Sequence, residues 1–219
     1  MTRSELAALL DHSVLKPETT AQDIEDGARI ARAWHVGYYC VQPCWVALAV
    51  DALAGSPVRT ISVVGFPHGC DVPDVKARAT ILAIADGARE IDTVMNFGAL
   101  RSGDPATVAA DIEAVVRAAQ GVPVKMIIEA AALTDAEKRL ACEIAVDAGV
   151  AFVKTSTGFH PAGGATAADV RLMREAVGAD IGVKASGGIR TLADASAMLD
   201  AGANRIGTSA SAAILGALK

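Results

Sequence analysis

Two lysines follow apolar runs at equivalent places in the sequence. Lys154 ends the run at residues 150–153 and is followed by Thr-Ser-Thr-Gly. Lys184 ends the run at residues 181–183 and is followed by Ala-Ser-Gly-Gly. A short apolar run that gives way to small residues and glycine is typical of a strand that ends in a loop. The sequence therefore predicts two lysines at the ends of two successive strands.

A crowded pair of lysines can do chemistry that a single exposed lysine cannot. With an ordinary pKa of ~10.4, about one lysine in 2,500 is a neutral amine at pH 7. A neighbouring ammonium and a dry pocket both disfavour the charged form, and a pKa shift of about three units corresponds to ~4 kcal/mol. One lysine can then attack a carbonyl as an amine while the other stays protonated. We take Lys154 as the candidate nucleophile and Asp92 as the candidate group for moving protons.

Further charged residues fall within the expected strands. A strand of a parallel barrel is covered on both faces, so each charge is costly unless it is paired. The charged residues concerned are Asp11, Asp92, Lys125, Glu129, Lys154 and Lys184. Two other interpretations stay open from the charge pattern: an ion network that only fills the barrel mouth, and lysines that only bind a phosphate.

Glycine-rich segments follow the last two expected strands. They are Ser186-Gly187-Gly188 and Gly207-Thr208-Ser209. Barrels often bind phosphate at this place with backbone N–H groups and hydroxyls, and glycine lets the backbone approach the oxygens. We expect a phosphate site here, although tight turns would also use glycine.

The elements that must hold these residues alternate between helix and strand. Capping signals at Thr20, Asp104 and Thr134 predict helix starts, and Asp71 with Pro73 predicts another. Glycines at 87, 149 and 202 are each placed where a helix ends and a strand begins. The expected strands cover residues 38–41, 58–64, 90–95, 122–129, 150–154, 181–184 and 204–207, with a short candidate at 9–11.

Seven or eight such repeats predict an α/β fold of the (β/α)8 TIM-barrel type, as one domain over residues 1–219. The alternative is an open, doubly wound sheet, but no Gly-x-Gly-x-x-Gly follows the first strand. In a barrel, reactive residues come from the carboxyl ends of the strands. The residues that we expect at or just beyond these ends are Asp11, Cys40, Asp92, Glu129, Lys154, Lys184 and Ser209.

Composition excludes several classes of function. The net charge is −5 and no basic block stands out, so nucleic acid is not expected as a partner. No apolar run approaches the ~20 residues of a membrane span, and the first ten residues do not resemble a signal peptide, so we expect a cytoplasmic protein that has no membrane partner. The four cysteines and four histidines lack the spacing of a metal site, and reduced thiols are expected.

The sequence closely resembles the deoxyribose-phosphate aldolases, which are class I aldolases. The resemblance covers nearly the whole chain, at residues 10–17, 64–69, 90–96, 153–159, 183–190 and 205–209. It implies reversible cleavage of 2-deoxy-D-ribose 5-phosphate to D-glyceraldehyde 3-phosphate and acetaldehyde, in deoxynucleoside breakdown, without metal or organic cofactor. It also suggests a homo-oligomer, a dimer or larger.

The resemblance implies a role for each matching residue. Lys154 would form the Schiff base, Lys184 would be the adjacent ammonium, and Asp92 the proton donor and acceptor. Around them the matching residues are Asp11 and Thr157 in a proton relay, Cys40 near the pocket, Lys125 for charge balance, and Gly158, Gly187, Gly188, Gly207 and Ser209 for phosphate.

Two departures from the family pattern affect these expectations. Members often have paired serines in the last phosphate loop, whereas here Ser209 is followed by Ala210, with Ser211 one step later. Some members end in a tail whose tyrosine assists proton transfer, and this sequence ends Gly-Ala-Leu-Lys. We therefore expect weaker phosphate binding, and slower protonation or a water in place of the tyrosine.

Three alternatives remain. A Schiff-base lyase acting on another sugar phosphate would share the lysine chemistry. A non-catalytic barrel that binds a phosphosugar would use the lysines as anion anchors. A metal-dependent aldolase is disfavoured because no histidine cluster is present.

Overall fold

The chain folds as a closed barrel of parallel strands. The computed structural model describes residues 1–218, and Lys219, the last residue of the expected domain, lies outside the described residues. The strands are β1 (Leu10–Val14), β2 (Tyr38–Val41), β3 (Arg59–Val64), β4 (Glu90–Val94), β5 (Val124–Ile127), β6 (Phe152–Lys154), β7 (Gly182–Ser186) and β8 (Arg205–Thr208). Each strand pairs in parallel with its neighbours in sequence, and β8 pairs with β1. The predicted (β/α)8 barrel is confirmed, and the open-sheet alternative is wrong because each of these strands is paired on both sides.

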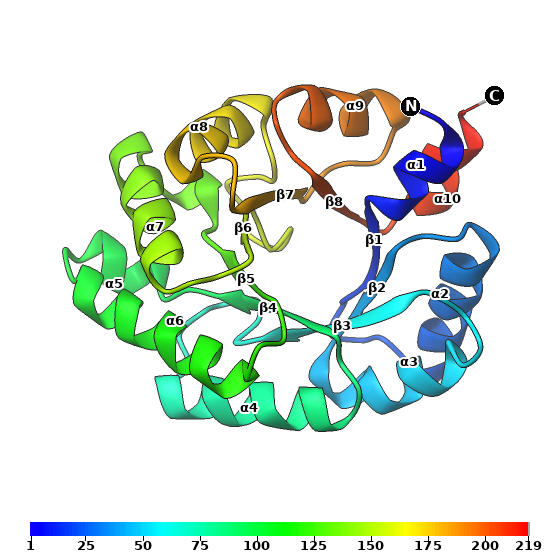
Figure 1. Ribbon diagram of the computed structural model, residues 1–219, viewed down its shortest axis with the longest axis horizontal. Helices are drawn as coiled ribbons and strands as arrows, with labels where there is room; N and C mark the ends of the chain where they lie inside the picture. The colour runs from blue at the N-terminus through cyan, green and yellow to red at the C-terminus, as the bar shows by residue number, and fades with distance from the viewer. Residues whose placement is uncertain (219) are drawn as a thin grey trace.

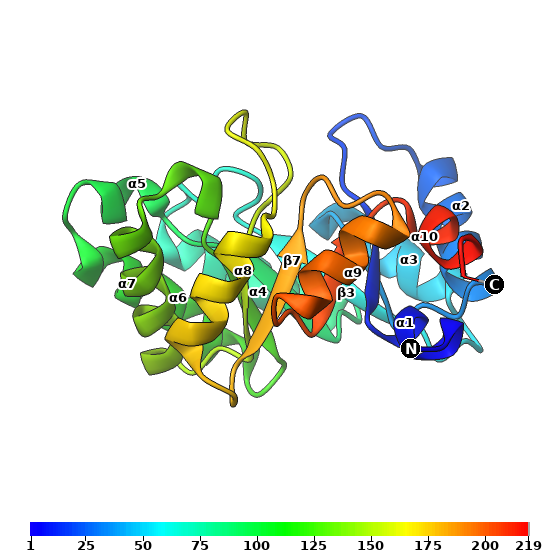
Figure 2. The ribbon, with the colours of Figure 1, turned by 90° about the horizontal axis from the view of Figure 1, so that it is seen from above.

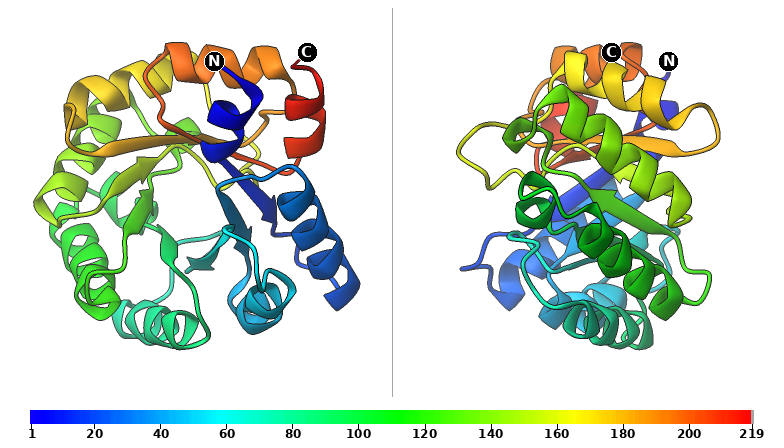
Figure 3. Two further views of the ribbon diagram at one scale, coloured as in Figure 1. Left: turned by 45° about the vertical axis from the view of Figure 1, so that its right-hand side comes forward. Right: turned by 90° about the vertical axis from the view of Figure 1, so that its left-hand side faces the viewer.

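Helices form the outer ring around these strands (Figure 1). The α-helices are α1 (Arg3–Ala8), α2 (Ala21–Ala33), α3 (Val46–Ala52), α4 (Pro73–Ala85), α5 (Phe97–Arg101), α6 (Pro105–Ala119), α7 (Asp135–Asp147), α8 (Ala167–Val177), α9 (Leu192–Asp200) and α10 (Ser211–Gly216). Two 3-10 turns, η1 (Pro43–Trp45) and η2 (Ala130–Ala132), lie in the loops after β2 and β5. Helices α1 and α10 lie side by side, so the two ends of the described chain meet (Figure 3).

The predicted helix starts are mostly confirmed, and the capping geometry explains them. Thr20 and Thr134 each accept a hydrogen bond from the third helical residue and form capping boxes. Asp104 caps α6 directly before its proline. Pro73 begins α4 as predicted, but Asp71 does not cap it, because the N-cap residue is Val72 and the helix has no side-chain cap. The three glycines at helix-to-strand junctions have φ values of 106°, 76° and 108°, which L-residues with a side chain rarely adopt.

The barrel interior is divided into a polar and an apolar part. Side chains of a strand alternate between the interior and the helices, so Glu90 and Asp92 of β4 share one face. Cys40 on β2 packs with Ile61 and Val63 on β3 in a small apolar cluster of its own. The larger apolar core lies between the strands and the helices. Charged side chains therefore gather in the interior on β4 to β8 and β1.

The loops at the carboxyl ends of the strands project from one end of the barrel. Figure 2 shows the loop after β1, in blue, and the loop after β6, in yellow, extending on the same side. The segment after β6 is held by Ala165, whose amide donates to the carbonyl oxygens of Ser186 and Gly187. These loops surround the cavity described below.

Candidate active site

Asp92 is the centre of the buried charged residues. Its Oδ2 atom lies 2.8 Å from Nζ of Lys154 and 2.6 Å from Nζ of Lys184. Its Oδ1 atom accepts a hydrogen bond from Lys125 at 2.8 Å. Asp92 and Lys125 have no exposed surface, and the two other lysines have 3% or less. One carboxylate thus contacts three lysine amines, from β5, β6 and β7.

The barrel register explains why these lysines meet. Lys154 and Lys184 are paired positions on β6 and β7. Asp92 and Lys125 are paired positions on β4 and β5. Since residues in register on neighbouring parallel strands lie about 5 Å apart, inward side chains at these positions are within contact distance. The predicted juxtaposition of the two lysines is confirmed.

Lys184 is held by a second carboxylate. Asp11 on β1 forms an ion pair with Lys184 Nζ through Oδ2, and its Oδ1 accepts from Arg205 at 2.9 Å. The expectation that Asp11, Asp92 and Lys184 lie at the ends of their strands is wrong, and Lys184 is the third of the five residues of β7. Asp11 is the second residue of β1 and Asp92 the third of β4, so both carboxylates lie below the barrel mouth.

The electrostatics separate the two lysines. Burial lowers the pKa of Lys154, and the nearby Lys184 ammonium lowers it further, against the opposing effect of Asp92. Burial also disfavours the charged form of Lys184, but Asp11 and Asp92 outweigh it and raise its pKa. For Asp92, burial raises the pKa, but the three lysines outweigh it and hold the pKa well below the usual range. Lys154 therefore loses its proton more readily than Lys184.

Cys40 lies beside this group on β2. It is buried, and burial raises its thiol pKa to about 12. The thiol is thus neutral at pH 7 and acts as a small apolar wall of the site.

The carboxylate of Glu129, whose own backbone is strained, holds Thr157 in place. Its hydroxyl donates to Glu129 Oε2 at 2.6 Å, and its backbone N–H donates to the same carboxylate. Glu129 has a left-handed backbone with φ of 55° and lies beyond β5. Its expected place in the charged network is wrong, because within residues 1–218 it forms no ion pair and instead holds the loop after Lys154.

A cavity of about 660 Å³ opens at the loop end of the barrel. The predicted site residues that line it are Asp11, Cys40, Lys154, Thr157, Gly158, Lys184, Gly187, Gly188, Gly207 and Ser209. Asp92 and Lys125 are absent from its lining; Asp92 contacts Lys154 and Lys184 from beneath the cavity, and Lys125 contacts Asp92. The structure therefore brings the two lysines and both glycine-rich segments to one cavity.

The glycine-rich segments offer free donors to this cavity. The amide N–H groups of Gly187, Gly188 and Ser209 donate to no acceptor within residues 1–218. Gly187 and Gly188 have φ values of 88° and 81°. Unpaired backbone donors in such a turn are well suited to bind an oxyanion.

Gly207 of β8 and Ser211 of α10 contact other side chains near the site. A Cβ on Gly207 would lie 3.1 Å from Cε of Lys184 and 2.9 Å from Cβ of Ser186, so this glycine makes room for the lysine. Ser211 does not supply the second serine hydroxyl of the family pattern. It is buried, and its Oγ lies 3.1 Å from Nδ1 of His12.

Sequence reasoning missed two members of the charged group, Glu90 and Arg205. Glu90 forms an ion pair with Lys125, and Arg205 lies 3.3 Å from Glu90. Both are buried, and both begin strands that were correctly expected. The criterion applied to the other charges, a charged residue within a parallel strand, would have found both.

Metal ligands do not gather within residues 1–218. In that part of the chain no group of three or more histidine, cysteine or acidic residues is arranged to hold a metal ion. None of the helices formed by these residues is long and apolar enough to cross a membrane.

A (β/α)8 barrel whose mouth cavity reaches a buried lysine of lowered pKa has the features of a Schiff-base-forming enzyme. The chain belongs to the DeoC/LacD family of aldolases, whose family model matches residues 6–216.

Relatives with known names agree with this family. Deoxyribose-phosphate aldolase 1 of Bacillus licheniformis is 54% identical over 212 residues, which span 96% of this chain and 95% of that protein. The deoxyribose-phosphate aldolase of Halalkalibacterium halodurans is 52% identical over 217 residues, spanning 98% and 96%. The tetrameric deoxyribose phosphate aldolase structure from Aeropyrum pernix matches with a TM-score of 0.91 and 30% identity, over 98% of this chain and 91% of that one.

Proposed function

We propose that this protein is a class I aldolase that reversibly cleaves 2-deoxy-D-ribose 5-phosphate to D-glyceraldehyde 3-phosphate and acetaldehyde. The observation that carries the proposal is Lys154, a buried lysine of lowered pKa that faces the cavity and shares Asp92 with a second lysine. The family membership and the names of the relatives support the same substrate.

Lys154 acts as the nucleophile. Its neutral amine attacks the C1 aldehyde of the open-chain sugar, and loss of water from the carbinolamine gives an iminium. Lys184 stays an ammonium beside it. Because both Nζ atoms contact Oδ2 of Asp92, this carboxylate can pass a proton from one nitrogen to the other during dehydration.

The bond that breaks is C2–C3 and not C3–C4, because C2 is the α carbon of the iminium and C3 is the β carbon that bears the hydroxyl. A base removes the proton of the C3 hydroxyl, and C3 becomes the aldehyde of glyceraldehyde 3-phosphate. The electron pair of the C2–C3 bond moves into an enamine. Protonation at C2 and hydrolysis then release acetaldehyde and return the Lys154 amine.

The residues around this centre have supporting roles in the proposal. Asp11 and Thr157 line the cavity and relay protons through water. Lys125 balances the charge of Asp92 from below, and Cys40 fills the wall. The phosphate is held by the free amides of Gly187, Gly188 and Ser209, with Gly158 and Gly207 at the same wall.

We further propose that residues 1–219 act as one domain, that the reaction needs no metal or organic cofactor, and that the protein is cytoplasmic. Its free cysteines suit a reducing compartment. Since the Aeropyrum pernix relative is tetrameric, we propose a homo-oligomer of this chain as well. The partners are then small phosphosugars and aldehydes.

The test is mass spectrometry of the intact protein after incubation with deoxyribose 5-phosphate and borohydride, followed by peptide mapping. We expect a reduced adduct on Lys154 that is lost in Lys154→Ala and unaffected by EDTA. If the folded protein binds the sugar but no adduct forms, the barrel is a non-catalytic phosphosugar-binding protein. If ribose 5-phosphate or another sugar phosphate is cleaved faster, the substrate assignment is wrong.

A further inference from the structure

The charged side chains of the barrel interior form a closed ring. From Arg205, ion pairs lead to Asp11, Lys184, Asp92, Lys125 and Glu90, and from Glu90 back to Arg205. Cations and carboxylates alternate around this ring, three of each, so it carries no net charge when all six groups are ionised. We call these six residues the charge ring.

Lys154 lies outside the charge ring. Its ion pair within residues 1–218 is with Asp92, whose oxygens already serve two ring lysines. With Lys154 protonated, the ring and Lys154 together hold four cations against three carboxylates, a net charge of +1. With Lys154 neutral, their net charge is zero.

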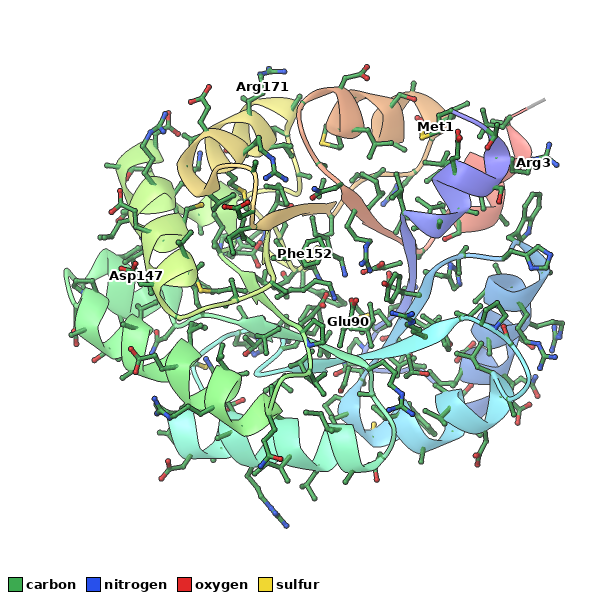
Figure 4. All side chains as sticks on the ribbon, viewed as in Figure 1. Met1, Arg3, Glu90, Asp147, Phe152 and Arg171 are labelled. Atoms are coloured by element: carbon green, nitrogen blue, oxygen red, sulfur yellow. The ribbon has the colours of Figure 1, made fainter. Side chains whose placement is uncertain are left out.

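We propose that Glu90 and Arg205 are positioning residues of the aldolase: they close the charge ring, so that Lys154 is the interior base whose proton can leave without unbalancing the buried charges. This proposal rests on the proposed Schiff-base role of Lys154. Neither Glu90 nor Arg205 lines the cavity, so both act through other side chains. Figure 4 shows Glu90 near the centre of the barrel.

The physical reason is the cost of unpaired charge in a dry interior. Loss of a proton from Lys125 or Lys184 would leave a buried carboxylate with one partner fewer and an excess negative charge in the ring. Loss of a proton from Lys154 leaves each ring member with two ring partners. The lowered pKa of Lys154 and the raised pKa of Lys184 agree with this difference.

The shape of the Arg205 side chain suits its place in the charge ring. Its guanidinium lies 3.7 Å from the centre of the Tyr38 ring, while its Nη1 atom contacts both Asp11 and Glu90. A planar guanidinium can stack flat on an aromatic ring while its N–H groups pair with two carboxylates. Burial lowers the pKa of Arg205, but Asp11 and Glu90 outweigh it and raise the pKa, so its charge is permanent.

Other groups face Lys154 from the surrounding strands. Asp92 on β4, Lys184 on β7 and Cys40 on β2 influence it directly. The remaining ring members lie further away, on β1, β4, β5 and β8. His12 on β1 is kept neutral at pH 7 because burial lowers its pKa to about 4. Glu129 is bound to Thr157 and stays the same in each variant below.

The test compares pH profiles of kcat/KM for deoxyribose 5-phosphate cleavage. Arg205→Met gives the ring a net charge of −1, which favours protonated Lys154. The acidic limb of the kcat/KM profile, which reports the loss of the Lys154 proton, therefore moves to higher pH. Glu90→Gln gives the ring a net charge of +1, so the limb moves to lower pH. Arg205 lies two strands away from Lys154, a distance of about 10 Å. A change of one unit charge at this distance should shift the limb by about one pH unit. The double variant restores neutrality and the wild-type limb.

Two further variants serve as controls. Arg205→Lys keeps the charge and should keep the limb in place, even where it loses the stacking on Tyr38. Arg89→Met removes a positive charge next to Glu90 in sequence, but at an exposed position outside the ring. Because solvent screens an exposed charge, this variant should leave the limb where it is.

The outcomes separate this proposal from the proposed function. If wild-type protein gives no borohydride-trapped adduct on Lys154, the proposed function fails first. If the adduct forms but the two single variants shift the limb in the same direction, or neither shifts it, the charge ring proposal is overturned. A double variant that is folded by circular dichroism and more impaired than both single variants, or one that does not fold, would also overturn it.

Discussion

Lys154 and Lys184 share one oxygen atom of Asp92, at 2.8 and 2.6 Å, yet their pKa values move in opposite directions. The difference comes from Asp11, which forms an ion pair with Lys184. Two lysines in matching positions on neighbouring strands are thus made unequal by a residue on β1. Their substitution should therefore have unequal consequences.

Replacing Lys154 should abolish turnover without weakening the fold. Lys154→Met removes the nucleophile, and we expect kcat/KM to fall by about four orders of magnitude or more. The charge ring remains neutral, so the free energy of unfolding should change by less than about 1 kcal/mol. Coupled cleavage assays and urea unfolding measure the two effects. A loss of several kcal/mol would show that Lys154 is mainly structural.

Replacing Lys184 should reduce both activity and stability. Lys184→Met leaves Asp11 and Asp92 each without one buried partner, which costs about 3 kcal/mol or more. Loss of the neighbouring ammonium raises the pKa of Lys154, so kcat/KM at pH 7 should fall by a factor of about 100 or more. The same two assays apply. Equal stability of the two lysine variants would contradict the ion-pair assignment.

The buried His12 should make stability depend on pH. Its folded pKa, about 4, lies below its unfolded pKa of about 6.5. Between these pH values the unfolded state binds more protons than the folded state. The stabilisation that comes from neutral His12 is therefore fully present above pH 6.5 and is lost as the pH falls toward 4. The loss should reach about 3 kcal/mol. Asp11 and Asp92, whose pKa values are lowered, contribute losses only at still lower pH.

Urea unfolding of His12→Asn from pH 7 to pH 4 measures this contribution. The variant should lose most of the pH dependence, although the contact of His12 with Ser211 is altered as well. His35→Asn is the matched control, since His35 is exposed over part of its surface and has a left-handed backbone that asparagine tolerates. An unchanged slope in His12→Asn would be the contradicting result.

The phosphate loop should be sensitive to one methyl group. In Gly187→Ala the new Cβ would lie 3.0 Å from Cα of Gly164 and 3.3 Å from Cα of Gly158, at a φ of 88°. We expect KM for deoxyribose 5-phosphate to rise about tenfold or more, because the donors at Gly187 and Gly188 move. Trapping of acetaldehyde on Lys154, which needs no phosphate, should persist.

Gly121→Ala provides the control for that substitution. Gly121 has a φ of 90°, but an added Cβ would meet no atom within 4 Å, so only the backbone strain is tested. Its KM should stay unchanged. A matching rise in KM for both variants would mean that Gly187 acts through general strain and not through the phosphate site.

The barrel could be predicted from the sequence because its local signals are strong and regular. The capping boxes at Thr20 and Thr134 and the proline after Asp104 place three helices correctly. The short helices α1, α5 and α10 escape prediction, since five or six residues carry too few turns for a periodic apolar pattern.

The sequence predicts which residues form the site better than it predicts how deep in the barrel they lie. Lys154 ends β6 as expected, whereas β1 runs beyond its expected limit at Asp11, and Asp92 and Lys184 lie in the middle of β4 and β7. The pairing of Glu90 with Arg205 joins residues 115 positions apart. Such a contact depends on barrel closure and register, which local patterns do not specify.

The far end of the barrel is occupied by aromatic rings. Phe152 fills the space that Gly182 leaves open, because a Cβ on this glycine would overlap the Phe152 ring. Arg205 lies between Phe152 and Tyr38, and Asp92 and Lys125 beyond these rings have no exposed surface. The cavity therefore opens at the loops, at the end of the barrel opposite these rings. A sugar in this cavity meets Lys154 and Lys184 from the loop side, while Arg205 and the two rings lie behind them.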